Sequence, residues 1–215
     1  ARTLRRYGDP KLVEQVLPLV TATDFDALQQ GAMFMTEQGA GSDVAGIRTT
    51  AKRDGDDYVL NGRKIFISNG PIADVLLVYA KTAPERGAKG ISAFLVEKDM
   101  PGFGVAKELK KMGWRGCPTG ELVFENCRVP ARNLVGGENA GVGVVMSGLD
   151  IERAFFAVPI CAAAQRCLDL SLEYAAQREQ FGKPIGEQQM VQAMLADLYT
   201  EIEAARLLAY RALLS

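Results

Sequence analysis

Two short segments carry the side chains that could do chemistry in this chain. The first runs from Met33 to Asp43, where an apolar stretch opens into Gly39-Ala40-Gly41-Ser42. Backbone N–H groups of glycine, which have no Cβ beside them, can approach a planar ring or a phosphate closely. The segment matches neither the dinucleotide fingerprint nor the phosphate-binding loop, because residue 44 is not glycine and the lysine of that loop is lacking. Taken alone, a sharp turn between two strands is the simpler explanation.

The second segment, Asp150-Ile151-Glu152-Arg153, offers two carboxylates and a forked cation within a predicted helix. Asp150 and Arg153 are three residues apart and share a helix face, so an intrahelical ion pair is compatible with a binding role. Glu152 is a candidate general base, and its alternative is an exposed helix residue with an arginine nearby. The chain has no histidine, which excludes a Ser-His-Asp or Cys-His nucleophile, a histidine proton shuttle and every histidine-ligated metal site.

The composition is that of a globular protein. The 215 residues include 25 Lys and Arg against 26 Asp and Glu, and the net charge of −1 argues against a basic nucleic-acid-binding surface. With 48% hydrophobic residues, the chain can bury a core. At about 100–200 residues per domain, this length predicts one large domain or two modest ones. We expect neither a metal site nor a nucleic-acid partner.

Neither a membrane span nor an export signal is expected. The longest uncharged apolar stretch, Ala154–Ala164, falls well short of the ~20 residues that a spanning helix needs. The basic start, Ala1–Arg6, has no apolar core behind it and no initiator methionine, and we expect it to be the interior of something longer. Four cysteines without C-x-x-C spacing are typical of reduced thiols, which predicts a bacterial cytoplasm or a mitochondrial matrix.

Residues 31–137 are predicted to form a β domain. Short β-rich runs alternate there with glycine, proline or asparagine. Asp54-Gly55-Asp56-Asp57 and Asn61-Gly62 are each predicted to make a hairpin turn between strands. Many short strands with no helix between them indicate an antiparallel sandwich or barrel.

Helical periodicity flanks this region on both sides. Residues 1–30 are predicted to be the end of a helical domain, with a helix broken at Pro18. Residues 138–215 are predicted to form one helix over 144–178 and a second that reaches about Leu214, with a stop at Gly182-Lys183-Pro184 between them. Two antiparallel helices cannot bury their apolar faces alone, so further helices are expected from the chain's continuation or from another subunit.

The order and spacing of several motifs resemble those of the acyl-CoA dehydrogenases, flavoproteins that oxidise acyl-CoA thioesters at Cα–Cβ. The resemblance covers nearly the whole chain. The motifs that carry it are Met35-Thr36-Glu37 with Gly39-Ala40-Gly41-Ser42-Asp43, Leu60-Asn61-Gly62-Arg63-Lys64 with Phe66-Ile67-Ser68-Asn69-Gly70, Met112-Gly113-Trp114-Arg115 with Val123-Phe124-Glu125 and Val129-Pro130, Leu149-Asp150-Ile151-Glu152-Arg153, and Arg178-Glu179-Gln180-Phe181-Gly182. The family commonly has Pro in place of Gln38, Trp in place of Phe66 and Thr in place of Ser68.

The resemblance implies an α+β multidomain fold within a chain truncated at both ends. Its parts are the end of an N-terminal helical domain over 1–30, an antiparallel β-barrel flavin-binding domain over 31–137, and the first part of a C-terminal helical bundle over 138–215. It also implies FAD as cofactor, an electron-transfer flavoprotein as electron acceptor, and a homo-oligomer that is a dimer of dimers. The expected type is isovaleryl-like, acting on a short or branched acyl chain in fatty acid metabolism or branched-chain amino acid degradation.

The resemblance also assigns the cofactor contacts. Thr36 would hydrogen-bond the pyrimidine end of the flavin, Phe66 would pack on the isoalloxazine, and Ser68 would hydrogen-bond N5, the atom that receives hydride. The alternative for the Phe66 strand is ordinary core alternation, and for the neighbouring-subunit contacts it is a helix-ending arginine with a packed phenylalanine. The implied cofactor-binding residues are Phe34, Met35, Thr36, Gly41, Ser42, Phe66, Ile67 and Ser68, with Arg178, Phe181 and Gln189 reaching the FAD of a neighbouring subunit.

By the same resemblance, Glu152 is the catalytic base that removes the Cα proton. It stands in the Asp-x-Glu-Arg pattern of the isovaleryl-CoA and long-chain branches, and a carboxylate in a dry pocket is the natural base for a chain without histidine. Most of the family take the base from a later segment, which would lie beyond Ser215, so both positions stay open. Ser42 would contact the thioester arm of the substrate, and Asp150 and Arg153 would contact the pantetheine and phosphate part of CoA.

Two other functions are compatible with these residues. An oxidase or monooxygenase on the same scaffold would differ in its reactivity with oxygen, which no residue in the sequence decides. A non-catalytic partner subunit or fragment would supply half of a binding site and oligomerise through its helices. Acyl chain length and branching also stay open.

Overall fold

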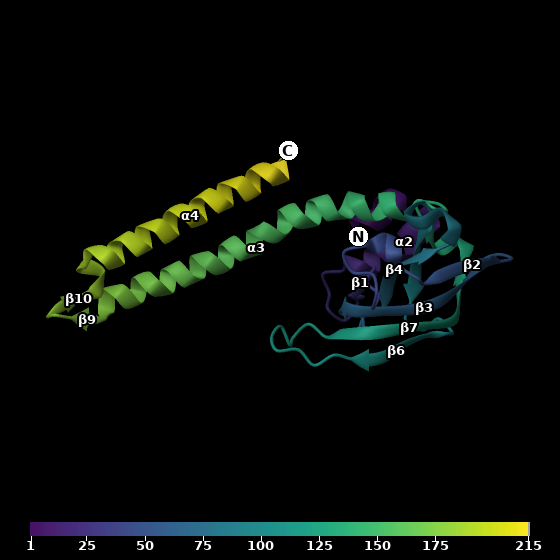
Figure 1. Ribbon diagram of the computed structural model, residues 1–215, viewed down its shortest axis with the longest axis horizontal. Helices are drawn as coiled ribbons and strands as arrows, with labels where there is room; N and C mark the ends of the chain where they lie inside the picture. Colours follow the sequence, from purple (N-terminus) through teal and green to yellow (C-terminus); the bar gives the residue numbers. More distant parts are fainter. Residues whose placement is uncertain (215) are drawn as a thin grey trace. The chain divides into compact units, whose positions relative to one another are not determined.

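The structure is a computed structural model that describes residues 1–214 (Figure 1). The chain divides into two compact units, Ala1–Ser147 and Gly148–Ser215. Among the helices within residues 1–214, none is both long and apolar enough to cross a membrane.

Two short helices open the first unit. α1 spans Arg2–Tyr7 and α2 spans Pro10–Val20. Asp9 caps α2, since its Oδ1 accepts a hydrogen bond from the backbone N–H of Lys11 at 2.9 Å. The expected break at Pro18 is wrong, and the helix continues to Val20. A proline this close to the end of a helix removes one backbone donor without stopping the last turn.

A sheet of eight strands forms the body of the first unit (Figure 1). Hydrogen-bonded neighbours follow the order β6-β7-β3-β2-β4-β5-β8, and β1 pairs with β4 beside this path. The strands are β1 Gly31–Phe34, β2 Thr50–Asp54, β3 Asp57–Ser68, β4 Val75–Lys81, β5 Ile91–Glu97, β6 Phe103–Glu108, β7 Thr119–Pro130 and β8 Leu134–Val135. Short 3-10 helices lie between them: η1 Val44–Gly46, η2 Pro84–Gly90 and η3 Ala131–Asn133. A sheet domain followed by a helical one confirms the fold class predicted from the sequence.

Of the two predicted hairpin turns, one is present. β2 and β3 pair antiparallel up to Asp54↔Asp57, and Gly55 adopts a φ of +63° in the turn between them. The turn predicted at Asn61-Gly62 is wrong, because β3 runs through these residues and only a register shift against β7 marks them. Glycine is needed there for close approach, since a Cβ on it would lie 2.4 Å from Oγ1 of Thr49.

The sheet is antiparallel except at two pairings, where it differs from the fully antiparallel arrangement expected. β1 runs parallel to β4 from Gly31↔Val75 to Phe34↔Val78, and β2 meets β4 in the same sense at one residue pair. Parallel neighbours need a long connection, and the β2–β3 hairpin lies within the stretch that joins β1 to β4. β1 also contacts β3, which brings the residues after β1 to the middle of β3.

The hydrophobic core gathers on one face of these strands. Alternate residues of β4 enter it, as the two-residue period of a strand requires. The rings of Tyr58 and Phe94 pack with their centroids 4.9 Å apart and their planes at 59°. Large side chains in this cluster include Phe34, Tyr58, Leu60, Ile67, Leu76, Val78, Phe94, Val96, Leu122 and Phe124. Each contributes about 1.5–3 kcal/mol by leaving water.

The second unit is an antiparallel pair of helices. α3 spans Gly141–Gln177, so it begins in the first unit, and α4 spans Gln189–Leu214. Between them lie the two-stranded hairpin of β9 Glu179–Gln180 and β10 Lys183–Pro184 and the 3-10 helix η4 Ile185–Glu187 (Figure 1). Arg206 of α4 donates to the side-chain oxygen of Gln165 on α3 at 2.6 Å, which ties the helices together.

Much of the apolar surface of the helical pair is exposed. Along the predicted apolar face of α4, Ile202 is buried, whereas Met190, Met194 and Leu198 are exposed. Phe155 and Phe156 on α3 are also exposed, at 62% and 61%. Two helices alone therefore leave these faces largely uncovered, as the sequence predicted.

We expect Phe94→Ala to lower the free energy of unfolding of the first unit by about 3–5 kcal/mol, because the ring is fully buried and its loss leaves a cavity against Tyr58. Urea unfolding followed by far-UV circular dichroism measures the change. Phe25→Ala is the matched control, since Phe25 is 89% exposed and its loss is expected to cost no more than about 0.5 kcal/mol. Equal effects of the two substitutions would contradict the assigned core.

Candidate functional site

The predicted cofactor residues of the first unit meet where β1 ends beside the middle of β3. The backbone N–H of Ile65 donates to the carbonyl oxygen of Thr36 at 2.9 Å. This bond holds Met35 and Thr36, both half-buried, next to Phe66. Residues that are about 30 positions apart in the sequence are thereby brought into one place on the surface of the sheet.

Phe66 has an unusual backbone and an exposed ring. Its φ is +60°, in the left-handed region that bulky side chains rarely adopt, and it lies at a register shift between β3 and β7. The side chain is 64% exposed. The suggested alternative of ordinary core alternation therefore does not describe this residue. Strained, exposed aromatic residues of this kind cluster at binding sites.

The residues around Phe66 divide between core and surface. Ser68 is exposed, so its hydroxyl is available to a bound group. Phe34 and Ile67 are 0% and 3% exposed and belong to the core cluster. These two predicted contact residues can therefore offer only their backbone to a cofactor, because their side chains pack inward.

The glycine-rich loop after β1 is open to solvent. Gly39, Gly41 and Ser42 are exposed, and a Cβ added at either glycine would meet no atom within 4 Å. Neither glycine has a positive φ among the backbone angles recorded for residues 1–214. Nothing within the described chain therefore requires glycine there, whereas a bound group that approaches the backbone closely would.

A buried ion pair that the sequence analysis assigned no role lies directly beneath this site. Lys64 Nζ is 2.8 Å from Glu37 Oε1, and their side chains are 0% and 9% exposed. The signal for it was present in β3, where Tyr58, Leu60 and Lys64 occupy positions on the buried face. A charge on a buried face needs a buried partner, and Glu37 is that partner.

Burial and mutual attraction act in opposite directions on the two charges of this pair. Burial alone would raise the pKa of Glu37, but the Lys64 ammonium and the hydrogen bonds from Lys64, Thr49 and Arg48 hold that pKa below its usual value. Burial lowers the pKa of Lys64 from its usual value, and the attraction of Glu37 opposes this shift. The attraction between the two opposite charges thus favours the ionised form of each group, against the effect of burial.

The predicted substrate and base residues lie on α3 in the second unit. Asp150, Glu152 and Arg153 are all exposed. Asp150 and Arg153 do not form an ion pair in the part of the chain that the structure describes, so both charged groups are free to meet a ligand.

The remaining predicted contacts surround the β9–β10 hairpin. Phe181 and Gly182 have φ values of +54° and +76°, as the two central residues of a type I′ turn require, and Phe181 is 94% exposed. The backbone N–H of Ile185 donates to the carbonyl of Arg178 at 2.8 Å, which closes the hairpin at its base. Gln189 is the first residue of α4. The hairpin thus presents an aromatic ring to solvent at its tip, with Arg178 and Gln189 near its base.

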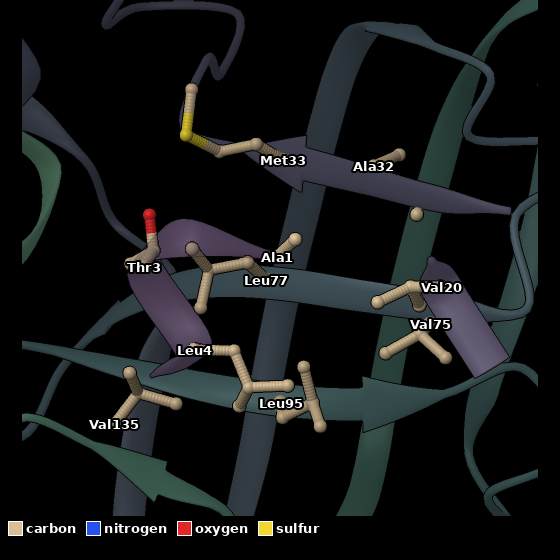
Figure 2. A pocket seen from close by; sticks show the side chains of 11 residues that line it. Ala1, Thr3, Leu4, Val20, Ala32, Met33, Val75, Leu77, Leu95 and Val135 are labelled. Carbon is tan, nitrogen blue, oxygen red and sulfur yellow. The ribbon is translucent and has the colours of Figure 1, made fainter. Parts of the chain in front are cut away.

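A cavity of about 400 Å³ in the first unit is a separate feature. Figure 2 shows its apolar lining, which includes Leu4 of α1, Met33 of β1 and Leu77 of β4. The Thr3 hydroxyl is the polar side-chain group among the residues that line it. It contains none of the predicted site residues and no carboxylate, lysine or arginine side chain lines it, so we do not assign the chemistry to it.

Two family models match the chain. The model described as "Acyl-CoA dehydrogenase, middle domain" matches residues 32–127, and that described as "Acyl-CoA dehydrogenase, C-terminal domain" matches residues 139–215. Among curated proteins, a mitochondrial isovaleryl-CoA dehydrogenase from Solanum tuberosum is 51% identical over 203 residues, which is 94% of this chain and 48% of that protein. The chain spans about half the length of the curated relatives it matches.

Solved structures share the fold. The structure of a glutaryl-coenzyme A dehydrogenase in complex with glutaryl-CoA superposes with a TM-score of 0.91 at 41% identity and covers 98% of this chain and 52% of that one. PigA, described with FAD and proline, superposes with a TM-score of 0.90 at 37% identity and covers 98% of this chain and 54% of its own. Proteins with this fold therefore include one described with an acyl-CoA and one described with FAD.

We expect Phe66→Gly to raise the free energy of unfolding by about 1 kcal/mol, because glycine adopts a φ of +60° without the Cβ penalty and the exposed ring contributes little burial. Urea unfolding measures the change. Phe25→Gly is the matched control, since Phe25 is exposed and has no positive φ, and glycine there is expected to destabilise by about 0.5–1 kcal/mol. A loss of stability at both positions would argue against strain at Phe66.

Proposed function

The chain belongs to the acyl-CoA dehydrogenase family, and from that premise we propose that it carries part of an FAD-dependent enzyme that oxidises an acyl-CoA thioester to the 2-enoyl-CoA. The observation that carries this proposal is the junction of β1 with β3. An exposed aromatic ring on strained backbone, two hydroxyl side chains and an open glycine loop gather there within one unit. This is the set of groups that a planar ring with an attached diphosphate needs.

The residues present fit FAD. Phe66 offers a face for a planar ring, and Thr36 and Ser68 offer hydroxyl groups beside it. The glycine loop provides backbone N–H groups at positions where a Cβ would meet nothing in the chain itself. Arg178, Phe181 and Gln189 would hold the FAD of a neighbouring subunit, and the 94% exposure of Phe181 supports a role for this hairpin outside its own chain. FAD bound there supplies the acceptor for the hydride that leaves Cβ.

Substrate contacts follow from the exposed charges on α3 and from the loop after β1. Arg153 offers a forked cation to a phosphate or carbonyl oxygen of CoA, and Asp150 accepts hydrogen bonds from the pantetheine amides. Ser42 lies at the end of the glycine loop and would donate to the thioester arm. Asp150 and Arg153 form no ion pair with one another among the described residues, which supports a binding role for each.

Glu152 is the proposed base. It would take the Cα proton as the hydride leaves Cβ, and both electrons of the Cα–H bond become the new double bond. Its exposure in this chain means that the bound thioester itself must displace the water around the carboxylate. A base beyond Ser215 is the alternative outcome of the test below.

The substrate and partners are proposed from the relatives. The potato protein at 51% identity is named an isovaleryl-CoA dehydrogenase, which supports a short or branched acyl chain. We propose an electron-transfer flavoprotein as the electron acceptor, a homo-oligomer built through the exposed helical faces, and a bacterial cytoplasm or mitochondrial matrix as the location.

An anaerobic visible spectrum of the purified protein, recorded before and after addition of isovaleryl-CoA, tests the proposal. We expect a flavin band that bleaches and a long-wavelength charge-transfer shoulder that appears. A flavin band that does not bleach would overturn the proposal of isovaleryl-CoA as substrate and would support the proposal of FAD as cofactor. The absence of flavin would favour a non-catalytic partner subunit. Rapid reoxidation of the reduced flavin by oxygen with release of peroxide would favour an oxidase or monooxygenase.

We expect Glu152→Gln to reduce turnover by about 10²–10⁴-fold and to leave FAD bound, because the amide cannot accept the Cα proton. A dye-coupled assay measures the rate, and the flavin absorbance measures occupancy. Glu173→Gln, an exposed glutamate on the same helix, is the matched control and should retain activity. Full activity in Glu152→Gln would place the base in another segment.

A further inference from the structure

The end of β1 is held by contacts from a single lysine and a single glutamate. Lys64 Nζ donates to the carbonyl oxygen of Met35 at 3.1 Å as well as to Glu37 Oε1 at 2.8 Å. The lysine on β3 therefore contacts the residues on both sides of Thr36. Together with the backbone bond from Ile65 to Thr36, these contacts hold residues 35–37 against β3.

The glutamate extends the same link to the end of the connection between β1 and β2. Glu37 Oε2 accepts from the backbone N–H of Arg48 at 2.5 Å, and Oε1 accepts from that of Thr49 at 3.0 Å. Glu37 also exchanges two backbone hydrogen bonds with Ala40, both 3.0 Å long. One carboxylate thus joins Glu37 to the two residues just before β2, and so it closes the stretch of residues 38–47 that contains the Gly39–Ser42 loop.

The position of Lys64 also connects this link to Phe66. Lys64 is the last residue paired with β7 before the register shift, and Phe66 lies within the shift with its φ of +60°. An apolar residue at position 64 could fill the same space, but it could not hold Met35 and Glu37 at once. A buried charge pair tolerates only arrangements that keep both charges compensated, so it selects one geometry where an apolar pair would allow several.

We infer that the Glu37–Lys64 pair is a positioning pair for the cofactor site: it touches neither FAD nor substrate, and it sets the relative positions of Thr36, Phe66 and the Gly39–Ser42 loop. This inference rests on the proposed function, because those three elements are the proposed FAD contacts. The positioning itself has a basis that does not depend on FAD. The contacts from Glu37 and Lys64 to Met35, Arg48 and Thr49 are hydrogen bonds within the first unit.

The chain contains a matched control at the opposite end of the same strand. Asp74 Oδ2 accepts from the backbone N–H of Gln30 at 2.9 Å, immediately before β1, and Asp74 Oδ1 pairs with Lys98 at 2.5 Å. This second pair also fixes β1, but it lies at the end away from Thr36. If FAD affinity falls because β1 is generally loosened, substitution in either pair should lower it. If the Glu37–Lys64 pair acts by positioning, only substitution of Glu37 should lower it.

The experiment compares Glu37→Gln with Asp74→Asn in the full chain. FAD affinity is measured by titration of flavin fluorescence at a temperature where circular dichroism shows each protein folded. We expect Glu37→Gln to weaken FAD binding by about tenfold or more and to alter the circular dichroism of the bound flavin bands, because its amide presents a donor toward the N–H of Arg48 or Thr49. Asp74→Asn is expected to leave FAD affinity within about twofold of the original protein and the flavin bands unchanged.

Each outcome decides the inference. The inference is overturned if a folded Glu37→Gln protein keeps the FAD affinity and flavin spectrum of the unsubstituted protein. It is also overturned if Glu37→Gln and Asp74→Asn lose FAD affinity equally. If Glu37→Gln does not fold, Glu37→Asp keeps Lys64 compensated but shortens the reach by one methylene, and the same criteria apply to it. No FAD binding by the unsubstituted chain would instead overturn the proposed function and the inference with it, so the two failures are distinguishable.

Discussion

The buried pair of Lys64 and Glu37 is the constraint on which the first unit's site depends. Taking two charges out of water costs several kcal/mol for each ion, so the arrangement persists only where attraction and further hydrogen bonds offset that cost. Here the lysine has two acceptors and the carboxylate has three donors. Every partner belongs to β3 or to the connection between β1 and β2. The hydrogen bonds that compensate the two charges are therefore the same ones that fix the geometry of the site.

Strained backbone carries several of the exposed aromatic rings in the described residues. Phe66 and Phe181 both have φ values between +50° and +60°, and both rings are exposed. Neither ring is stabilised by burial, and the conformation costs free energy, so the surrounding structure must impose it. In β3 the imposing element is the register shift against β7, and in the second unit it is the tight hairpin of β9 and β10. Both features suit rings that a bound group covers.

The two units carry different parts of the proposed chemistry: the first carries the proposed cofactor contacts, and the second carries the proposed base and substrate contacts. The sheet of the first unit, with its dense core, fixes backbone and hydroxyl groups for a cofactor. The helical pair of the second unit has few buried side chains, and a long helix carries Asp150, Glu152 and Arg153 to its surface. A proton-abstracting carboxylate needs exclusion of water, which the bound thioester would supply at Glu152.

The sequence by itself determined the alternation of helical and β regions, the hairpin at Gly55, the helical pair and the membership of the family, because side-chain periodicity, turn chemistry and motif order are local properties. It did not determine that β3 would pass through Asn61-Gly62, since a turn dipeptide within a strand is decided by what packs against it, here Thr49. Nor did it assign Lys64 and Glu37 a role. Their partnership spans 27 positions, and only the parallel pairing of β1 with β4 brings the end of β1 to β3, where a buried charge meets its counter-charge.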